Sequence, residues 1–105
     1  MNRAADIRLE TNGNRGRYVR ALADGSEAEM AYVEDRPGVI IILHTYTPPP
    51  HRGQGFAAAL VEKAVADFRA AEKKVVPACW FARQQFAQNP DWADLLIEDG
   101  RGGLR

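Results

Sequence analysis

Residues 39–74, VIIILHTYTPPPHRGQGFAAALVEKAVADFRAAEKK, decide the fold of this chain. The stretch opens with apolar, mostly β-branched residues, which favour a strand, and passes through three consecutive prolines into two closely spaced glycines. Apolar residues then recur at helical spacing. A glycine turn between a strand and a helix presents unpaired backbone N–H groups at the positive end of the helix dipole. We therefore expect this turn to bind an anionic group such as a phosphate.

The strand expected at residues 39–47 ends in polar side chains. Its first five residues are apolar and four of them are β-branched, which favours burial on both faces. Alternation with period two places Ile40, Ile42, His44 and Tyr46 on one face and Ile41, Leu43, Thr45 and Thr47 on the other. Because prolines cannot donate to a ladder, residues 46–50 are expected to form a rigid, ligand-lining exit rather than a paired strand. The polar end lies beside the glycine turn, where open α/β sheets bind ligands.

Alternating segments before this stretch complete a sheet. The expected strands are residues 7–10, 17–22 and 27–34. Asn-Gly and Asp-Gly dipeptides separate them, and such short turns predict that the second, third and fourth strands form an antiparallel meander. In the third strand, Ala28, Met30 and Tyr32 are expected to face inward.

The segments after the prolines predict a helical crossover. The apolar spacing from Gly53 indicates an amphipathic helix of about 20 residues, roughly 30 Å long. Residues 75–79 are expected to form a short apolar strand, parallel to the strand at 39–47 because a helix connects them. A helix at 80–88 and a short turn or helix at 91–96 follow, and residues 101–105 are expected to fray. The fold class is α/β (α+β), with a mixed, mostly antiparallel sheet of about five strands, a glycine-turn and long-helix crossover, and a short C-terminal helix.

Composition narrows the class of protein. A chain of 105 residues fits one domain, and its formal net charge of zero disfavours general attraction to nucleic acid or to an acidic membrane surface. The single cysteine, Cys79, excludes an intrachain disulfide and fits a reducing, cytoplasmic location. Cys79, His44 and His51 form no paired ligand spacing, so no metal site is expected. Neither a signal-peptide core nor an apolar run near the ~20 residues of a membrane span is present.

Several motifs together resemble the GNAT acyltransferase superfamily. Its signature Q/R-x-x-G-x-G/A, between a strand and a helix, matches at residues 52–55, although the leading slot holds Pro50. The chain resembles more closely a branch of very small members, which have an HT-x-x-P-P run before the turn, here residues 44–49. These members also carry a V-V-P-x-C strand after the helix, here 75–79. Residues 89–95 are similar to that branch's H-P-E/D-aromatic-A-D-L ending, with Asn89 in the histidine slot.

The resemblance implies that residues 1–105 are a single GNAT-like domain that binds acetyl-CoA as a cosubstrate. The pyrophosphate would lie on the amides of residues 53–57, and the pantetheine would pair with the backbone of residues 44–46 like an added strand. The expected cofactor-binding residues are His44, Thr45, Tyr46, Arg52, Gly53, Gln54, Gly55, Phe56 and Ala57. The thioester would then lie between the ends of the fourth and fifth strands, where Cys79 is expected.

Two side chains are candidates for catalysis. Cys79 precedes a helix N-terminus, which stabilises a thiolate, so it could accept the acetyl group or protonate the leaving thiolate. It could equally be a small buried apolar residue. His44 could act as a general base near neutral pH or could only orient the strand end through a hydrogen bond. His51 is expected to be solvated, and Glu27, Glu29 and Glu34 could act through water, as in many GNAT enzymes, or simply form the outer face of a hairpin.

These observations predict an N-acetyltransferase that transfers an acetyl group from acetyl-CoA to an amine, whose identity the sequence leaves open. One alternative is a CoA- or acyl-CoA-binding module without efficient transfer, and another is an interaction domain that retains only the fold. The expected partners are acetyl-CoA and an amine-bearing substrate, with no nucleic acid and no membrane. A domain of this size lacks much of the usual acceptor wall, so either a monomer with an open cleft or a partner protein that completes the acceptor site is expected.

Overall fold

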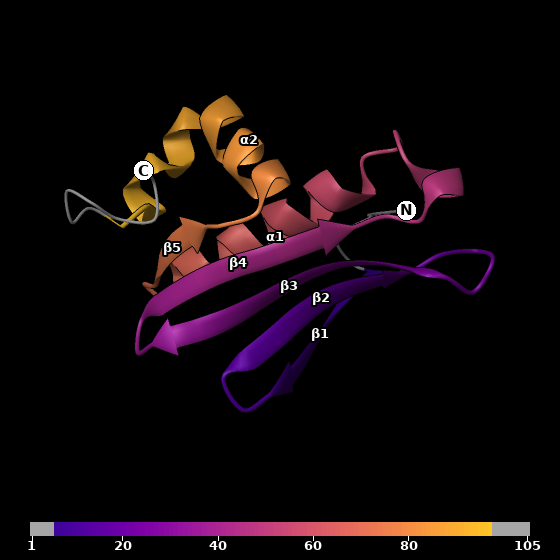
Figure 1. Cartoon of the computed structure of the whole chain (residues 1–105). Helices are drawn as coiled ribbons and strands as arrows, with labels where there is room; N and C mark the ends of the chain where they lie inside the picture. The colour runs from indigo at the N-terminus through magenta and orange to yellow at the C-terminus, as the bar shows by residue number, and fades with distance from the viewer. Residues whose placement is uncertain (1–5, 98–105) are drawn as a thin grey trace.

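A computed structural model of the chain describes residues 6–97 and contains one five-stranded sheet with helices on one face (Figure 1). The strands follow one another in space as they do in sequence: β1 Ile7–Asn12, β2 Arg15–Ala21, β3 Glu27–Arg36, β4 Val39–Tyr46 and β5 Lys74–Pro77. The α-helices are α1 Phe56–Ala70 and α2 Trp80–Gln88, and the short 3-10 helices are η2 Pro49–His51 and η3 Pro90–Leu95. None of the helices in this part of the chain is both long and apolar enough to cross a membrane. The expected fraying of residues 101–105 concerns a segment outside the described residues.

The predicted fold class is confirmed. The first four strands pair in antiparallel order and β5 pairs with β4 in parallel, as a helical crossover requires. Ala28 and Met30 are fully buried under the helices, and Tyr32 packs against the same core, so the inward face of β3 is also as predicted. The opposite face of the sheet is covered by no helix of residues 6–97, and we call it the open face (Figure 1).

The predicted alternation of β4 is wrong beyond Ile42, because a β-bulge interrupts its pairing with β3. Ile42 pairs with Tyr32, but the next pair joins His44 to Ala31, so Leu43 has no partner of its own. An extra residue of this kind moves all following side chains to the other face. His44 therefore points to the open face and Thr45 to the helix-covered face. Leu43 is 38% exposed, so the expected burial of β4 on both faces is also wrong.

Helix α1 is shorter than predicted, with 15 residues and a length of about 22 Å. Its start is delayed because Gly53 and Gly55 adopt φ values of +83° and +84°, which no residue inside a right-handed helix adopts. Its end is a Schellman motif in which Glu72 takes a positive φ of 59° and the amide of Lys73 donates to the carbonyl of Phe68. The turns on both sides of α1 thus fix its length.

The apolar run at residues 75–79 forms a shorter strand than predicted. β5 ends at Pro77, and Cys79 is the N-cap residue of α2 rather than part of the strand. The boundaries of α2 agree with the prediction, and the expected last turn or helix forms as η3. Cys79 is therefore held by the start of a helix, which fixes the direction of its side chain.

A close contact between β2 and β3 gives a test of the core packing. Gly16 lies opposite Tyr32, and a Cβ atom built on Gly16 would be 2.3 Å from Cζ of the Tyr32 ring. The ring cannot move away easily because it also packs against Tyr18 and Phe68, at centroid distances of 6.0 Å and 5.2 Å. We expect Gly16→Ala to lower the free energy of unfolding by about 1–3 kcal/mol, measured by urea denaturation. The loss should shrink in a Tyr32→Leu background, and an equal loss in both backgrounds would contradict this packing.

Candidate functional site

A cavity lies at the C-terminal end of β4, between the starts of α1 and α2. Its volume is about 500 Å³. It is lined by the end of β4 and the following loop, by the first turn of α1 and by one side of α2: Thr45, Tyr46, Thr47, His51, Arg52, Gly53, Gly55, Phe56, Ala57, Ala58, Phe81 and Gln85. Seven of the nine residues expected to bind the cosubstrate, all except His44 and Gln54, thus lie around this one cavity.

The N-terminus of α1 opens into this cavity without a side-chain cap. Gly55 is the N-cap residue, no side chain caps the helix, and its first turn contains no acidic residue. The amides of Phe56, Ala57 and Ala58 precede the first intrahelical bond, which the amide of Ala59 donates to the carbonyl of Gly55. Three backbone donors at the positive end of a 15-residue helix therefore point toward the cavity, a suitable arrangement for a phosphate.

Two basic side chains of the loop between β4 and α1, His51 and Arg52, line the cavity. Nε of Arg52 donates to the carbonyl of Thr47 at 2.8 Å, and its guanidinium lies 5.9 Å from the centre of the Tyr46 ring. The expectation that His51 is solvated is wrong, because its side chain is only 20% exposed and its Nε2 lies 2.9 Å from Oδ2 of Asp24. Hydrogen bonds from Ser26 and then from His51 hold the pKa of Asp24 below its usual range. The contact between His51 and Asp24 thereby connects the loop before α1 with the turn between β2 and β3.

β4 and β5 separate just before the cavity. Their last pair is Ile42 with Pro77, and the amide of Ala78 donates to the carbonyl of Ile42 at 3.1 Å. From there β4 continues along β3 to Tyr46, whereas the segment that follows β5 turns into α2. The expectation that Tyr46 has left the sheet is therefore wrong on the β3 side, although Thr47 onward has left it. On the β5 side, the β4 edge beyond Ile42 can pair with the amides of an extended ligand.

Cys79 lies where the two strands separate, on the helix-covered side. Its Sγ accepts a hydrogen bond from the amide of Ala82 at 3.3 Å and lies 3.9 Å from Oγ1 of Thr45. Thr45 also lines the cavity, so it connects the thiol with the cavity beside the glycine turn. The side chain of His44 points instead to the open face of the sheet and contacts Glu29. The structure therefore does not bring the two candidate catalytic side chains together.

The three glutamates considered as remote bases have different partners. Glu34 accepts hydrogen bonds from Lys73 and from the amide of Gly38, near the β3–β4 turn and far from the cavity along the strand. Glu27 lies between Arg8 and Arg17 on the open face. Of the three, Glu29 alone contacts His44.

The sequence interpretation missed the α2 side of the cavity. Phe81 and Gln85 line it one helical turn apart, and Thr47 and Ala58 complete the wall. Phe81 and Gln85 belong to no motif, and their positions depend on how α2 packs against α1. The spacing of Phe81 and Gln85 predicts that they share one face of the expected helix at 80–88. This spacing does not indicate which face of the helix lies against the cavity.

The fold and the cavity define a class of protein: a domain in which β4 and β5 separate beside a cavity at the uncapped N-terminus of a helix. Residues 17–95 match the profile of the GCN5-related N-acetyl-transferase family, and the chain belongs to that family. The fold is similar to that of a GCN5-like candidate N-acetyltransferase from Staphylococcus aureus, solved by NMR in solution, with a TM-score of 0.62. That comparison covers 90% of this chain and 92% of the other at 18% identity, so it shows the fold alone. No curated protein matches the chain significantly.

Proposed function

We propose that this protein is an N-acetyltransferase that transfers the acetyl group of acetyl-CoA to an amine. The observation that carries the proposal is the uncapped N-terminus of α1, which opens into a cavity that reaches Thr45. Oγ1 of Thr45 lies 3.9 Å from Sγ of Cys79, where β4 and β5 separate. Membership of the family supports the same activity. Residues 1–105 would act as one acetyl-CoA-binding domain.

Two chemical parts of the cosubstrate, the pyrophosphate and the pantetheine, would bind in and beside the cavity. The pyrophosphate would accept hydrogen bonds from the amides of residues 53–57, with Arg52 supplying positive charge. The pantetheine amides would pair with the backbone of residues 44–46 along the unpaired edge of β4. The cavity volume of about 500 Å³ is in the range of small-molecule sites.

Acetyl transfer requires a neutral amine and a leaving thiolate. The nitrogen lone pair attacks the thioester carbon, the C–N bond forms, the C–S bond breaks, and the thiolate of CoA takes up a proton. Cys79 lies on the helix-covered side of the gap, where it could contact the leaving sulfur or take the acetyl group first. His44, on the open side, would accept the proton that the amine releases. An amine that approaches from the open face would thus have the base on its own side of the sheet.

Release of the CoA thiol in the presence of a panel of amines tests this proposal. We expect thiol release that depends on both acetyl-CoA and the amine, with acetylated amine formed in equal amount. Binding of acetyl-CoA without transfer to any amine would favour the alternative of a CoA-binding module. Absence of binding would favour an interaction domain that retains only the fold. A transfer rate that rises when a second protein is added would indicate that a partner completes the acceptor site.

A further inference from the structure

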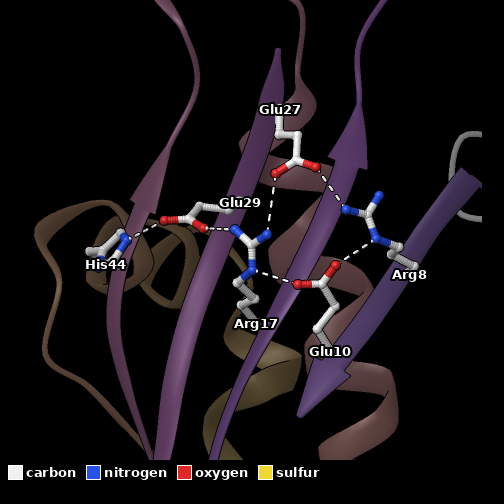
Figure 2. Close-up of polar contacts among 6 residues, drawn as sticks. All are labelled: Arg8, Glu10, Arg17, Glu27, Glu29 and His44. Atoms are coloured by element: carbon white, nitrogen blue, oxygen red, sulfur yellow. Dashed lines mark hydrogen bonds and ion pairs between the residues drawn. The ribbon is translucent and has the colours of Figure 1, made fainter. Parts of the chain in front are cut away.

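A network of charged side chains crosses the open face of the sheet from β1 to β4 (Figure 2). It contains Arg8, Glu10, Arg17, Glu27, Glu29 and His44. Arg17 is its centre, because its guanidinium bonds with one carboxylate on β1, Glu10, and with two on β3, Glu27 and Glu29. His44 ends the network on β4, at the edge of the β4–β5 gap.

Glu29 contacts His44 through one carboxylate oxygen and Arg17 through the other. Its Oε2 lies 2.8 Å from Nε2 of His44, and its Oε1 accepts a hydrogen bond from Nη1 of Arg17. The Glu29 side chain is 23% exposed, whereas that of His44 is 54% exposed. The carboxylate is thus fixed within the sheet surface, and the imidazole that it contacts is open to a ligand.

This contact depends on the bulge in β4. Glu29 pairs with Tyr46, and His44 pairs with Ala31, so Glu29 and His44 are diagonal neighbours on one face, within reach of long side chains. Without the bulge at Leu43, His44 would point toward the helices and away from Glu29. An irregularity of the strand therefore brings together a carboxylate and an imidazole beside the gap where the thioester is expected.

The contact determines which ring nitrogen carries the proton when His44 is neutral. An ionised carboxylate only accepts hydrogen bonds, so Nε2 must donate to Glu29, and Nδ1 keeps the lone pair. Glu29 is ionised near neutral pH, since the hydrogen bond to His44 and then that from Arg17 lower its pKa. The other charged groups of the network, Glu10, Glu27 and Arg8, contact Arg17 or one another rather than His44.

We propose that Glu29, held by Arg17, is a positioning residue that fixes His44 with Nε2 protonated and Nδ1 free to accept the proton of the acceptor amine. The catalytic part of this proposal rests on the proposed acetyltransferase function. The tautomer of the His44 ring does not depend on that function, so the tautomer and the role in acetyl transfer can be disproved separately.

Nitrogen-15 NMR of the histidine rings, above the titration range of imidazole, tests the positioning directly. The wild type should show His44 with Nε2 protonated. In Glu29→Gln, the side-chain amide can donate to Nε2, and a substantial Nδ1-protonated population should appear. Glu27→Gln removes a carboxylate from the same network without touching His44, so it should leave the tautomer unchanged. An Nδ1-protonated ring in the wild type, or the same tautomer in Glu29→Gln, would overturn the proposal.

Kinetics test the role in transfer. Glu29→Gln should lower kcat at least about tenfold, with little change in the KM for acetyl-CoA, while Glu27→Gln should keep kcat within about twofold of the wild type. Equal kcat values for the two folded variants would overturn the positioning role. If the wild type transfers no acetyl group, the proposed function fails, and the tautomer measurement still decides whether Glu29 fixes the ring.

Discussion

Gly55→Glu is expected to abolish binding of acetyl-CoA, with at least about a hundredfold loss from a wild-type affinity on the order of micromolar. Gly55 is the N-cap residue of α1 and lies within residues 53–57, whose amides we assign to the pyrophosphate. A carboxylate there would itself occupy the positive end of the helix and would repel the phosphates. Calorimetric titration of wild type and variant with acetyl-CoA measures the difference.

Gly38→Glu is the matched control. Gly38 has the same φ of +84° as Gly55, and a Cβ atom on it would meet nothing within 4 Å. Both substitutions place a residue with a Cβ in the left-handed region, at a cost of about 1–2 kcal/mol, and both add one negative charge. Gly38 precedes β4, at the opposite end of the strand from the cavity, so only Gly55→Glu should lose the ligand. A folded Gly55→Glu protein that binds like the wild type would contradict the phosphate assignment.

Replacement of Cys79 is expected to lower turnover at least about tenfold, since its thiol lies where the thioester should bind. Two mechanisms fit. If Cys79 takes the acetyl group first, mixing with acetyl-CoA should leave a protein heavier by one acetyl group, with the label on Cys79. If the amine attacks directly, no such adduct forms and Cys79 only contacts the leaving group. Intact-mass spectrometry of wild type and Cys79→Ala distinguishes the two.

Cys79→Ser separates the chemistry from the structural role. Cys79 caps α2 by accepting a hydrogen bond from the amide of Ala82, and alanine would lose this cap. Serine is a favoured N-cap residue, so Cys79→Ser should keep the helix start while removing the thiol. Lower turnover in both variants would therefore report on the thiol. Wild-type turnover in both, with every amine that the wild type acetylates, would make Cys79 a packing and capping residue.

The parts of the fold that the sequence predicted carry local signals. Short glycine turns between alternating segments predicted the meander of β2, β3 and β4, and a long run at helical spacing predicted α1. The glycine turn before α1 was predictable for the same reason. Gly53 and Gly55 stand directly before that run, and both adopt the positive φ that favours glycine.

The parts that were missed depend on contacts between distant segments. The bulge at Leu43 arises from the register of β4 against β3, and a two-residue period cannot reveal it. That one residue moved His44 to the open face and Thr45 to the cavity. Phe81 and Gln85 joined the site only because α2 packs beside α1. The end of β5 at Pro77 shows how poorly a short apolar run defines its own boundary.

Titration of the nitrogen-15-labelled wild-type protein with acetyl-CoA, followed by backbone amide NMR, tests binding and its location together. The proposed site predicts saturable shifts that are largest at the amides of residues 53–57, with further shifts at Thr45 and in the first turn of α2. The groove between α1 and η3, whose lining includes Glu62, Arg69 and Trp92, should remain unaffected. No shifts at millimolar acetyl-CoA, or shifts confined to that groove, would contradict the proposed acetyl-CoA site.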